Sequence, residues 1–282
     1  MELWYTIVGL LPFEWAQPGR MLFMKNALLA ILVIAPLFGL LSTMVVQSRM
    51  SFFSDALGHS AFTGIAIGSL CGLTAPMGAA VIFALCFSLL FTWVRRKTTL
   101  GSDTVIGVFS STAVALGIFI ATFGGGSFAK FNAYLIGDIL SVEPAMIALL
   151  AVILLLVVAL WLTSFNPLLL SSIHPALAGS RGVRVVLQEW LFTAAIALVV
   201  TLSMTWVGLL VINSLLVLPA AAARNLARNV RQYHLFAVLG ALVAGVAGLL
   251  ISYYGGSSTG ACITLCLALF FLLSLLGQRR GK

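Results

Sequence analysis

The sequence has few charged residues. Only 8% of its 282 residues are Asp, Glu, Lys or Arg, against roughly 25% in an ordinary soluble domain. Hydrophobic residues make up 62% of the chain, and the mean hydropathy is +1.17. A water-soluble protein this poor in polar groups could not cover its own surface. The chain is therefore predicted to be a multi-pass membrane protein.

Signatures of nucleotide hydrolysis and of zinc proteolysis are also absent from the sequence. No stretch matches the phosphate-binding loop G-x-x-x-x-G-K-[ST] or the zinc motif H-E-x-x-H. The chain is therefore predicted not to be an enzyme. If ATP drives its activity, a separate chain is expected to hydrolyse it.

The N-terminal residues 1–25 lack the features of a removable signal peptide. The opening stretch MELWYTIVGLLPFEW has no basic region before its apolar residues, and no small-residue cleavage site follows. It is instead rich in rings that favour the lipid headgroup zone, namely Trp4, Tyr5, Phe13 and Trp15. Residues 1–25 are predicted to form an interfacial segment.

Cysteine is scarce, and all four cysteines lie within apolar stretches: Cys71, Cys86, Cys262 and Cys266. Cys262 and Cys266 would share a helix face, which is compatible with a metal site. Small packing residues in a helix bundle have the same pattern, and we interpret the pair in that way.

The long apolar stretches predict an all-α fold, a transmembrane helix bundle with about eight to nine spans. Most stretches have the roughly 20 residues that a helix needs to cross the hydrocarbon core. The run from Glu189 to Ala223 is too long for one span, so a turn is predicted at Trp206–Gly208. The nine predicted spans are 26–46, 52–73, 76–94, 104–123, 144–163, 189–205, 206–223, 234–254 and 258–276.

The basic residues predict the orientation of the bundle. With nine spans, twelve of the fifteen Lys and Arg residues fall on one side, and only Arg20, Lys25 and Lys130 fall on the other. Such a bias marks the cytoplasmic side, so the C-terminus is predicted to be cytoplasmic in a cell (inner) membrane, with the N-terminus outside. Because the net charge of +8 comes in short clusters between apolar spans, no nucleic acid is expected as a partner.

The remaining stretches divide the chain without indicating a second domain. Residues 26–278 are predicted to form one transmembrane domain, and 279–282 a cytoplasmic tail. Residues 164–188 would form a cytoplasmic region with a short helix between Pro175 and Gly182. Residues 124–143 would be external, and the piece 132–141, which is too short to cross the membrane, would be a re-entrant segment or a bent helix. No repeat of 20–50 residues is present.

Asp55 and His59 stand out because they are ionisable residues inside an otherwise apolar span. Spaced four residues apart, they project from the same helix face, with Thr63 one turn further on. A carboxylate and an imidazole suit a divalent transition metal such as zinc or manganese. From the spacing alone, a structural hydrogen bond or a proton relay would explain the pair as well.

Asp138 lies in the short external piece, after Gly137. It is expected either to line an outer vestibule or to cap the bent helix there. Thr63 and Asp138 are therefore candidate residues of a transport path.

Three segments together resemble a known family. Residues 49–64 read RMSFFSDALGHSAFTG, residues 132–140 read NAYLIGDIL, and residues 207–224 read VGLLVINSLLVLPAAAAR. Their patterns, order and intervals resemble those of the zinc/manganese permeases of ABC transporters, and the resemblance covers essentially the whole chain.

The resemblance implies a homodimeric ABC importer permease fold, with a separate cytoplasmic ABC ATPase and an extracytoplasmic metal-binding protein as partners. Asp55 and His59 would be the ion-coordinating pair. Residues 175–183 would be the helix that couples to the ATPase, starting at Pro175 and with Ala178 and Gly182 at its small positions. The cargo would be a zinc, manganese or ferrous ion, with no permanently bound cofactor.

The chain departs from the family pattern at several positions. Ser110 and Ser111 stand where some zinc-importing relatives have a histidine, Lys130 lies where an acid often precedes the second motif, and His174 replaces a serine-like residue. These differences leave the identity of the metal open.

Two other functions are compatible with parts of the sequence. A permease for chelated iron or a cobalamin-like substrate would share the architecture but would not need Asp55 and His59. An ion-coupled secondary transporter would use a similar bundle without any ATPase.

Overall fold

The computed structural model describes residues 2–10, 12–17, 19, 21–73, 76–122 and 137–277. The described part is helical and contains no strand. In chain order its elements are α1 (Glu2–Val8), the 3-10 turn η1 (Glu14–Ala16), α2 (Leu22–Gln47), α3 (Phe53–Leu70), α4 (Met77–Lys97), α5 (Ser102–Thr122), the 3-10 turn η2 (Ile139–Ser141), α7 (Pro144–Ile173), α8 (Pro175–Ser180), α9 (Val185–Val207), α10 (Leu209–Leu226), α11 (Val230–Gly255) and α12 (Thr259–Leu276).

Each of the nine predicted spans corresponds to one long helix. Within the described residues, eight of these helices are long and apolar enough to cross a membrane. The exception is α3, an 18-residue helix that contains Asp55 and His59. The predicted turn between two consecutive spans is confirmed, because α9 ends at Val207 and α10 begins at Leu209.

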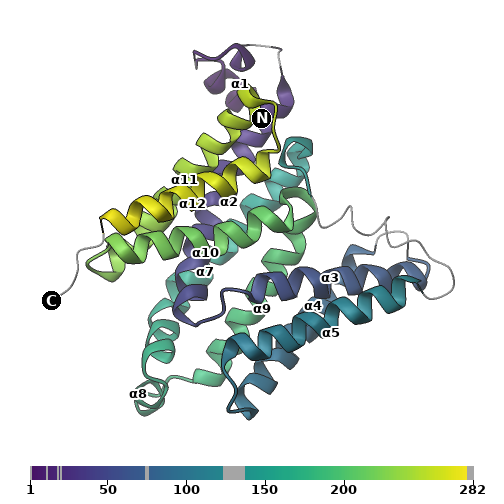
Figure 1. Ribbon diagram of the computed structural model, residues 1–282, viewed down its shortest axis with the longest axis vertical. Coiled ribbons are helices and arrows are strands. Elements are labelled where there is room, and N and C mark those ends of the chain that lie inside the picture. Colours follow the sequence, from purple (N-terminus) through teal and green to yellow (C-terminus); the bar gives the residue numbers. More distant parts are fainter. Residues whose placement is uncertain are drawn as a thin grey trace.

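The helices form two groups that meet along α9 and α10 (Figure 1). One group consists of α3, α4 and α5, with α3 packed against both neighbours. The other consists of α2, α10, α11 and α12. The two are joined because α9 packs against α4 and α3 on one side and against α7 and α10 on the other, while α10 also contacts α3.

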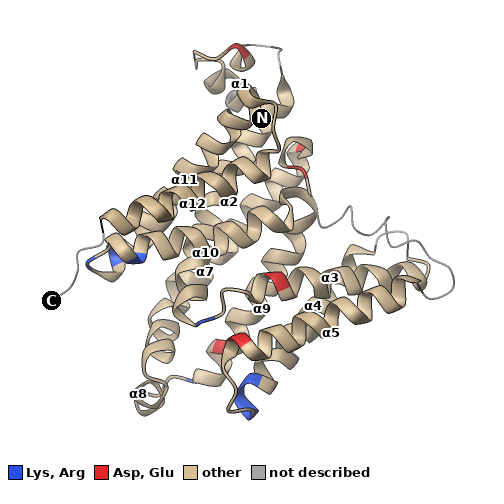
Figure 2. Ribbon diagram, in the orientation of Figure 1, with Lys and Arg blue, Asp and Glu red and all other residues tan. Residues whose placement is uncertain are grey.

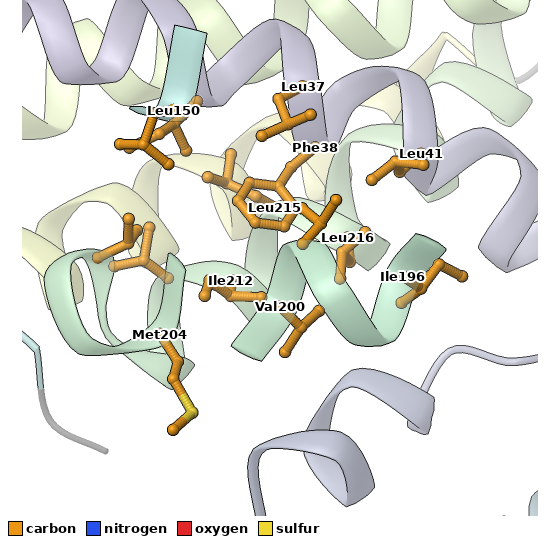
Figure 3. Packing of buried hydrophobic residues seen from close by; sticks show 14 of the residues in the cluster. Leu37, Phe38, Leu41, Leu150, Ile196, Val200, Met204, Ile212, Leu215 and Leu216 are labelled. Carbon is orange, nitrogen blue, oxygen red and sulfur yellow. The ribbon is translucent and has the colours of Figure 1, made fainter. Parts of the chain in front are cut away.

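The main hydrophobic core of the described residues extends through most of the helices, and Figure 3 shows the part of it where α2, α7, α9 and α10 converge. Phe38 of α2, Leu150 of α7, Val200 of α9 and Leu216 of α10 are fully buried there. Helices elsewhere approach closely at small residues, as membrane helices commonly do. A Cβ on Gly64 would lie 2.6 Å from the Cα of Ala80, so α3 and α4 pack almost backbone to backbone.

The N-terminal segment packs onto the start of α2. The indole nitrogen of Trp4 donates to the Lys25 carbonyl at 2.9 Å, and the ammonium of the buried Lys25 donates to the Gln17 carbonyl at 2.9 Å. Trp15 is also buried. These contacts place residues 2–10 and 12–17 beside one end of the bundle; their position at a lipid interface stays a prediction.

Positive charge is concentrated toward one end of the bundle. In Figure 2 the Lys and Arg segments at the α2–α3 connection, at the end of α4 and at the α10–α11 corner all lie in the lower left half of the view. This distribution agrees with the positive-inside pattern read from the sequence. Lys130 and the predicted tail 279–282 lie outside the described residues.

Candidate metal site and transport path

Asp55 and His59 lie side by side near the start of α3. The Nε2 atom of His59 is 3.6 Å from the Oδ2 atom of Asp55, and the two side chains are 29% and 43% exposed. This separation is long for a direct hydrogen bond. Two ligand atoms that each lie about 2.0–2.2 Å from one ion at a tetrahedral angle are about 3.4 Å apart. The 3.6 Å separation of the pair is close to this value.

Asn213 of α10 completes this cluster, and the sequence analysis missed it. Its amide Nδ2 donates to the Oδ1 atom of Asp55 at 3.0 Å, although 158 residues separate the two positions. The sequence did contain a signal for it, because a polar amide inside an apolar span requires a hydrogen-bond partner. What the sequence could not supply was the identity of that partner.

Asp55 and Asn213 line a cavity of about 770 Å³. Its other walls come from Gly137–Leu140, from the α9–α10 turn and from the α11–α12 turn, residues 257–260. The predicted external segment and the predicted metal ligand thus face one space. The cavity therefore extends from Asp138 to Asp55.

Asp138 caps a short 3-10 turn and also lines the cavity; that this cavity is an outer vestibule stays a prediction. The Asp138 carboxylate accepts a hydrogen bond from the backbone N–H of Leu140 at 3.0 Å, which caps η2, and the residue lines the cavity. The preceding residue, Gly137, has a φ of +55° and lies against Gly208, whose φ is +87°. A Cβ on Gly137 would lie 2.2 Å from the Gly208 nitrogen, so this contact requires glycine.

Thr63 faces a neighbouring helix in this structure. It is fully buried, and its hydroxyl donates to the Ala113 carbonyl of α5 at 2.8 Å. It is not among the residues that line the cavity. The structure therefore brings Asp55 and Asp138 to one cavity, places His59 beside Asp55, and directs Thr63 to the α3–α5 contact.

The segment Gly256–Gly260 reads G-S-S-T-G and formally matches the G-x-S-x-G nucleophile motif. In hydrolases that motif forms a sharp turn between a strand and a helix. Here it joins α11 to α12, with Gly256 as the C-cap and Ser258 as the N-cap. The match therefore gives no support to a hydrolase.

The described residues contain no group of three or more His, Cys, Asp and Glu side chains that could hold a metal ion. Cys262 and Cys266 therefore have no such third partner within those ranges. Asp55 and His59 likewise form a pair without a third such side chain within those ranges.

The predicted coupling segment forms the short helix α8. Pro175 is its first residue and Gly182, with a φ of +76°, lies in the turn after it. Ala178 is fully buried against the bundle, whereas Pro175 and Leu177 are exposed. The small side chain at Ala178 therefore lets α8 lie flat on α7 and α9, with an exposed outer surface.

An ion pair ties the helix after α8 to α4. The Oε2 atom of Glu189 is 2.8 Å from Arg96 and 3.7 Å from Arg95. Four residues further along α9, the hydroxyl of Thr193 lies 2.9 Å from that of Thr92. Glu189 and both arginines also line a second cavity of about 380 Å³ beside Pro175.

The chain is similar to permeases of metal transport systems over nearly its whole length. It is 34% identical to the manganese import system permease protein ScaB of Streptococcus parasanguinis, over 92% of this chain and 93% of that protein. It is 28% identical to the high-affinity zinc uptake system membrane protein ZnuB of Haemophilus influenzae, over 90% of this chain and 97% of that protein.

A solved structure of the same architecture exists. The fold superposes on PsaBC from Streptococcus pneumoniae, solved in complex with a Fab, with a TM-score of 0.77 and 27% sequence identity, covering 99% of this chain and 98% of that one. The profile of the ABC 3 transport family matches residues 20–278. This multi-pass membrane protein therefore belongs to the ABC 3 transport family.

Proposed function

We propose that the chain is the permease subunit of an ATP-driven importer for a divalent transition metal ion, with Asp55 and His59 as the ion ligands. The observation that carries this proposal is the geometry of the pair, whose facing oxygen and nitrogen atoms are 3.6 Å apart beside a 770 Å³ cavity. The names of the manganese and zinc relatives support a metal cargo.

The ion would enter from the Asp138 end of the cavity after delivery by an extracytoplasmic metal-binding protein. Carboxylate and imidazole ligands would replace part of its hydration shell. Two ligands per copy hold the ion weakly, and a second copy facing the first would bring the number to four. Conduction requires this balance, because an ion bound too firmly would not leave.

Energy would come from a separate ABC ATPase on the cytoplasmic side, where the C-terminus is also expected. The exposed surface of α8, between Pro175 and Gly182, is the proposed docking point. Movement of α8 would pass to α9, which follows directly and packs against both helix groups. The two copies would rock between outward-open and inward-open states, and the permease itself would make and break no covalent bond.

The two alternatives make different demands on the site. A permease for a metal chelate would have no use for paired ligands whose spacing fits a bare ion. A secondary transporter would need neither an ATPase nor the exposed surface of α8.

Metal accumulation in cells tests the proposal. Cells producing the chain with its ATPase and binding protein are expected to gain manganese, zinc or iron, measured by elemental analysis, and to lose that gain with an ATPase that cannot hydrolyse ATP. Accumulation that persists with the inactive ATPase would favour a secondary transporter. Uptake of a chelate in the absence of free-metal uptake would favour the other alternative.

A further inference from the structure

Asn213 contacts the proposed ion ligand from a different helix. Its side chain reaches from α10 to Asp55 of α3, with Nδ2 3.0 Å from Oδ1. Because Asn213 contacts Asp55, an inference about its role rests on the proposed function of Asp55 and His59 as ion ligands. Nothing in the resemblance or in the relatives' names assigns a role to this residue.

The two oxygens of Asp55 have different partners. Oδ1 accepts the amide hydrogen of Asn213, and Oδ2 faces the Nε2 atom of His59. A carboxylate held at one oxygen by a neighbouring helix cannot rotate freely about its last bond. The other oxygen is then held in the direction of the imidazole. Ligating carboxylates and histidines are commonly fixed by such outer hydrogen bonds.

The orientation of the Asn213 amide is explained by Asp55. Its own carbonyl oxygen, Oδ1, is buried and has no hydrogen-bond partner among the described residues. A buried acceptor without a donor is unfavourable. Turning the amide over would instead place that oxygen against the negatively charged carboxylate. The charge of Asp55 therefore determines which end of the amide faces it.

The Leu209 side chain of α10 packs against the Gly58 backbone of α3 close to this hydrogen bond. A Cβ on Gly58 would lie 2.5 Å from both methyl carbons of Leu209, so α3 and α10 touch one turn from each of the interacting residues. This contact fixes the distance that the short Asn213 side chain has to bridge. The hydrogen bond therefore lies beside a packed contact between α3 and α10.

We propose that Asn213 is a positioning residue of the ion site. It holds Oδ1 of Asp55 so that Oδ2 and the His59 nitrogen present themselves together to one cation. Without Asn213 the Asp55 carboxylate is no longer held in one orientation, and the affinity of the site for the ion falls, while the bundle stays folded.

Ion binding to the tag-free permease–ATPase complex tests this role, with Mn²⁺ and Zn²⁺ as probes in equilibrium dialysis. Asn213→Leu keeps the size of the side chain and removes the donor. Its affinity is expected to fall about 10–100-fold, the usual effect of losing an outer hydrogen bond to a metal ligand. Asn213→Gln restores an amide donor and is expected to recover most of that loss.

Ser214→Ala is the matched control. Ser214 is the next residue of α10, and its hydroxyl lies 2.9 Å from that of Thr264 on α12. This change removes a polar contact of the same helix away from Asp55, so the affinity is expected to stay within twofold. Thermal unfolding of each variant separates lost affinity from lost fold; if Asn213→Leu does not fold, Asn213→Val is measured with the same expectation.

The experiment distinguishes a failure of the inference about Asn213 from a failure of the proposed function. If the Leu variant binds both ions like the wild type while Asp55→Ala binds neither, Asn213 only ties two helices together and the inference is wrong, although the proposed function stands. If Asp55→Ala also binds both ions like the wild type, the proposed function itself fails.

Discussion

At the scale of single residues, Asp55 has two polar neighbours, His59 on its own helix and Asn213 on another, and it faces the cavity. If the pair binds the cargo, Asp55→Asn and His59→Gln should each lower ATP-dependent metal uptake at least tenfold, because each removes one of two ligands. Uptake of radioactive metal by vesicles containing the assembled transporter measures this effect.

Asp103→Asn is the control for that experiment. Asp103 is an exposed acid in the first turn of α5, and its loss should leave uptake unchanged. Normal uptake by both site variants would mean that Asp55 and His59 only hold the bundle together.

Gly137 provides a second test at the residue scale. Gly137→Ala would force a methyl group into the Gly208 backbone and place a side chain at a positive φ. We expect a loss of about 1–3 kcal/mol in the stability of this contact and faster proteolysis near the Asp138 loop. Gly78→Ala is the control, since a Cβ on Gly78 meets nothing within 4 Å; equal proteolysis of the two variants would contradict the tight contact.

At the scale of whole elements, the α4–α9 contact combines two kinds of interaction. Glu189→Gln should cost no more than about 1 kcal/mol, because the ion pair is partly exposed. Thr193→Val removes a buried hydroxyl and should cost on the order of 1 kcal/mol. Chemical unfolding of the purified protein measures both changes in stability. Glu143→Gln is the control, because the Glu143 side chain makes no capping hydrogen bond at the start of α7. No loss in either variant would mean that α4 and α9 are held by apolar packing alone.

The helix α8 allows packing and docking to be separated. Ala178→Leu places a large side chain where α8 lies on the bundle, so it should lower both the melting temperature and the amount of ATPase that co-purifies. Ala176→Leu changes an exposed position of the same helix and should weaken only the ATPase association. If ATPase binding survives in both variants, the docking surface lies elsewhere.

The elements were the most predictable part of the molecule. Each of the nine long helices in the described part of the chain was predicted from the length of its apolar stretch, and α8 was predicted from Pro175 and Gly182. The turn at Gly208 could be placed because an apolar run of 35 residues exceeds one span. Helix α3 was also predicted, although it contains Asp55 and His59, because most of its other residues are apolar or small.

Contacts between distant segments were less predictable. The i, i+4 spacing of Asp55 and His59 is a local property, so the pair could be found from the sequence. Asn213 meets Asp55, and Gly137 meets Gly208, only because helices far apart in the chain pack together. Thr63 shares a helix face with the pair by spacing, yet the packing of α5 covers it. Its burial depends on a neighbour that spacing does not identify.

At the scale of the whole molecule, Asp55 and His59 lie where the two helix groups meet. Asp55 belongs to the α3–α5 group, Asn213 belongs to the group around α2 and α10, and the cavity opens between them. If the pair binds the cargo, relative movement of the two groups would change the surroundings of the bound ion. This position makes the pair suitable for alternating access.

The most direct test of the account is the position of the ion in the assembled transporter. Anomalous scattering from crystals containing Mn²⁺ or Zn²⁺ would reveal it. The account predicts a peak about 2.0–2.2 Å from both Oδ2 of Asp55 and Nε2 of His59. A transported ion bound elsewhere in the bundle, with no peak at this pair, would contradict it.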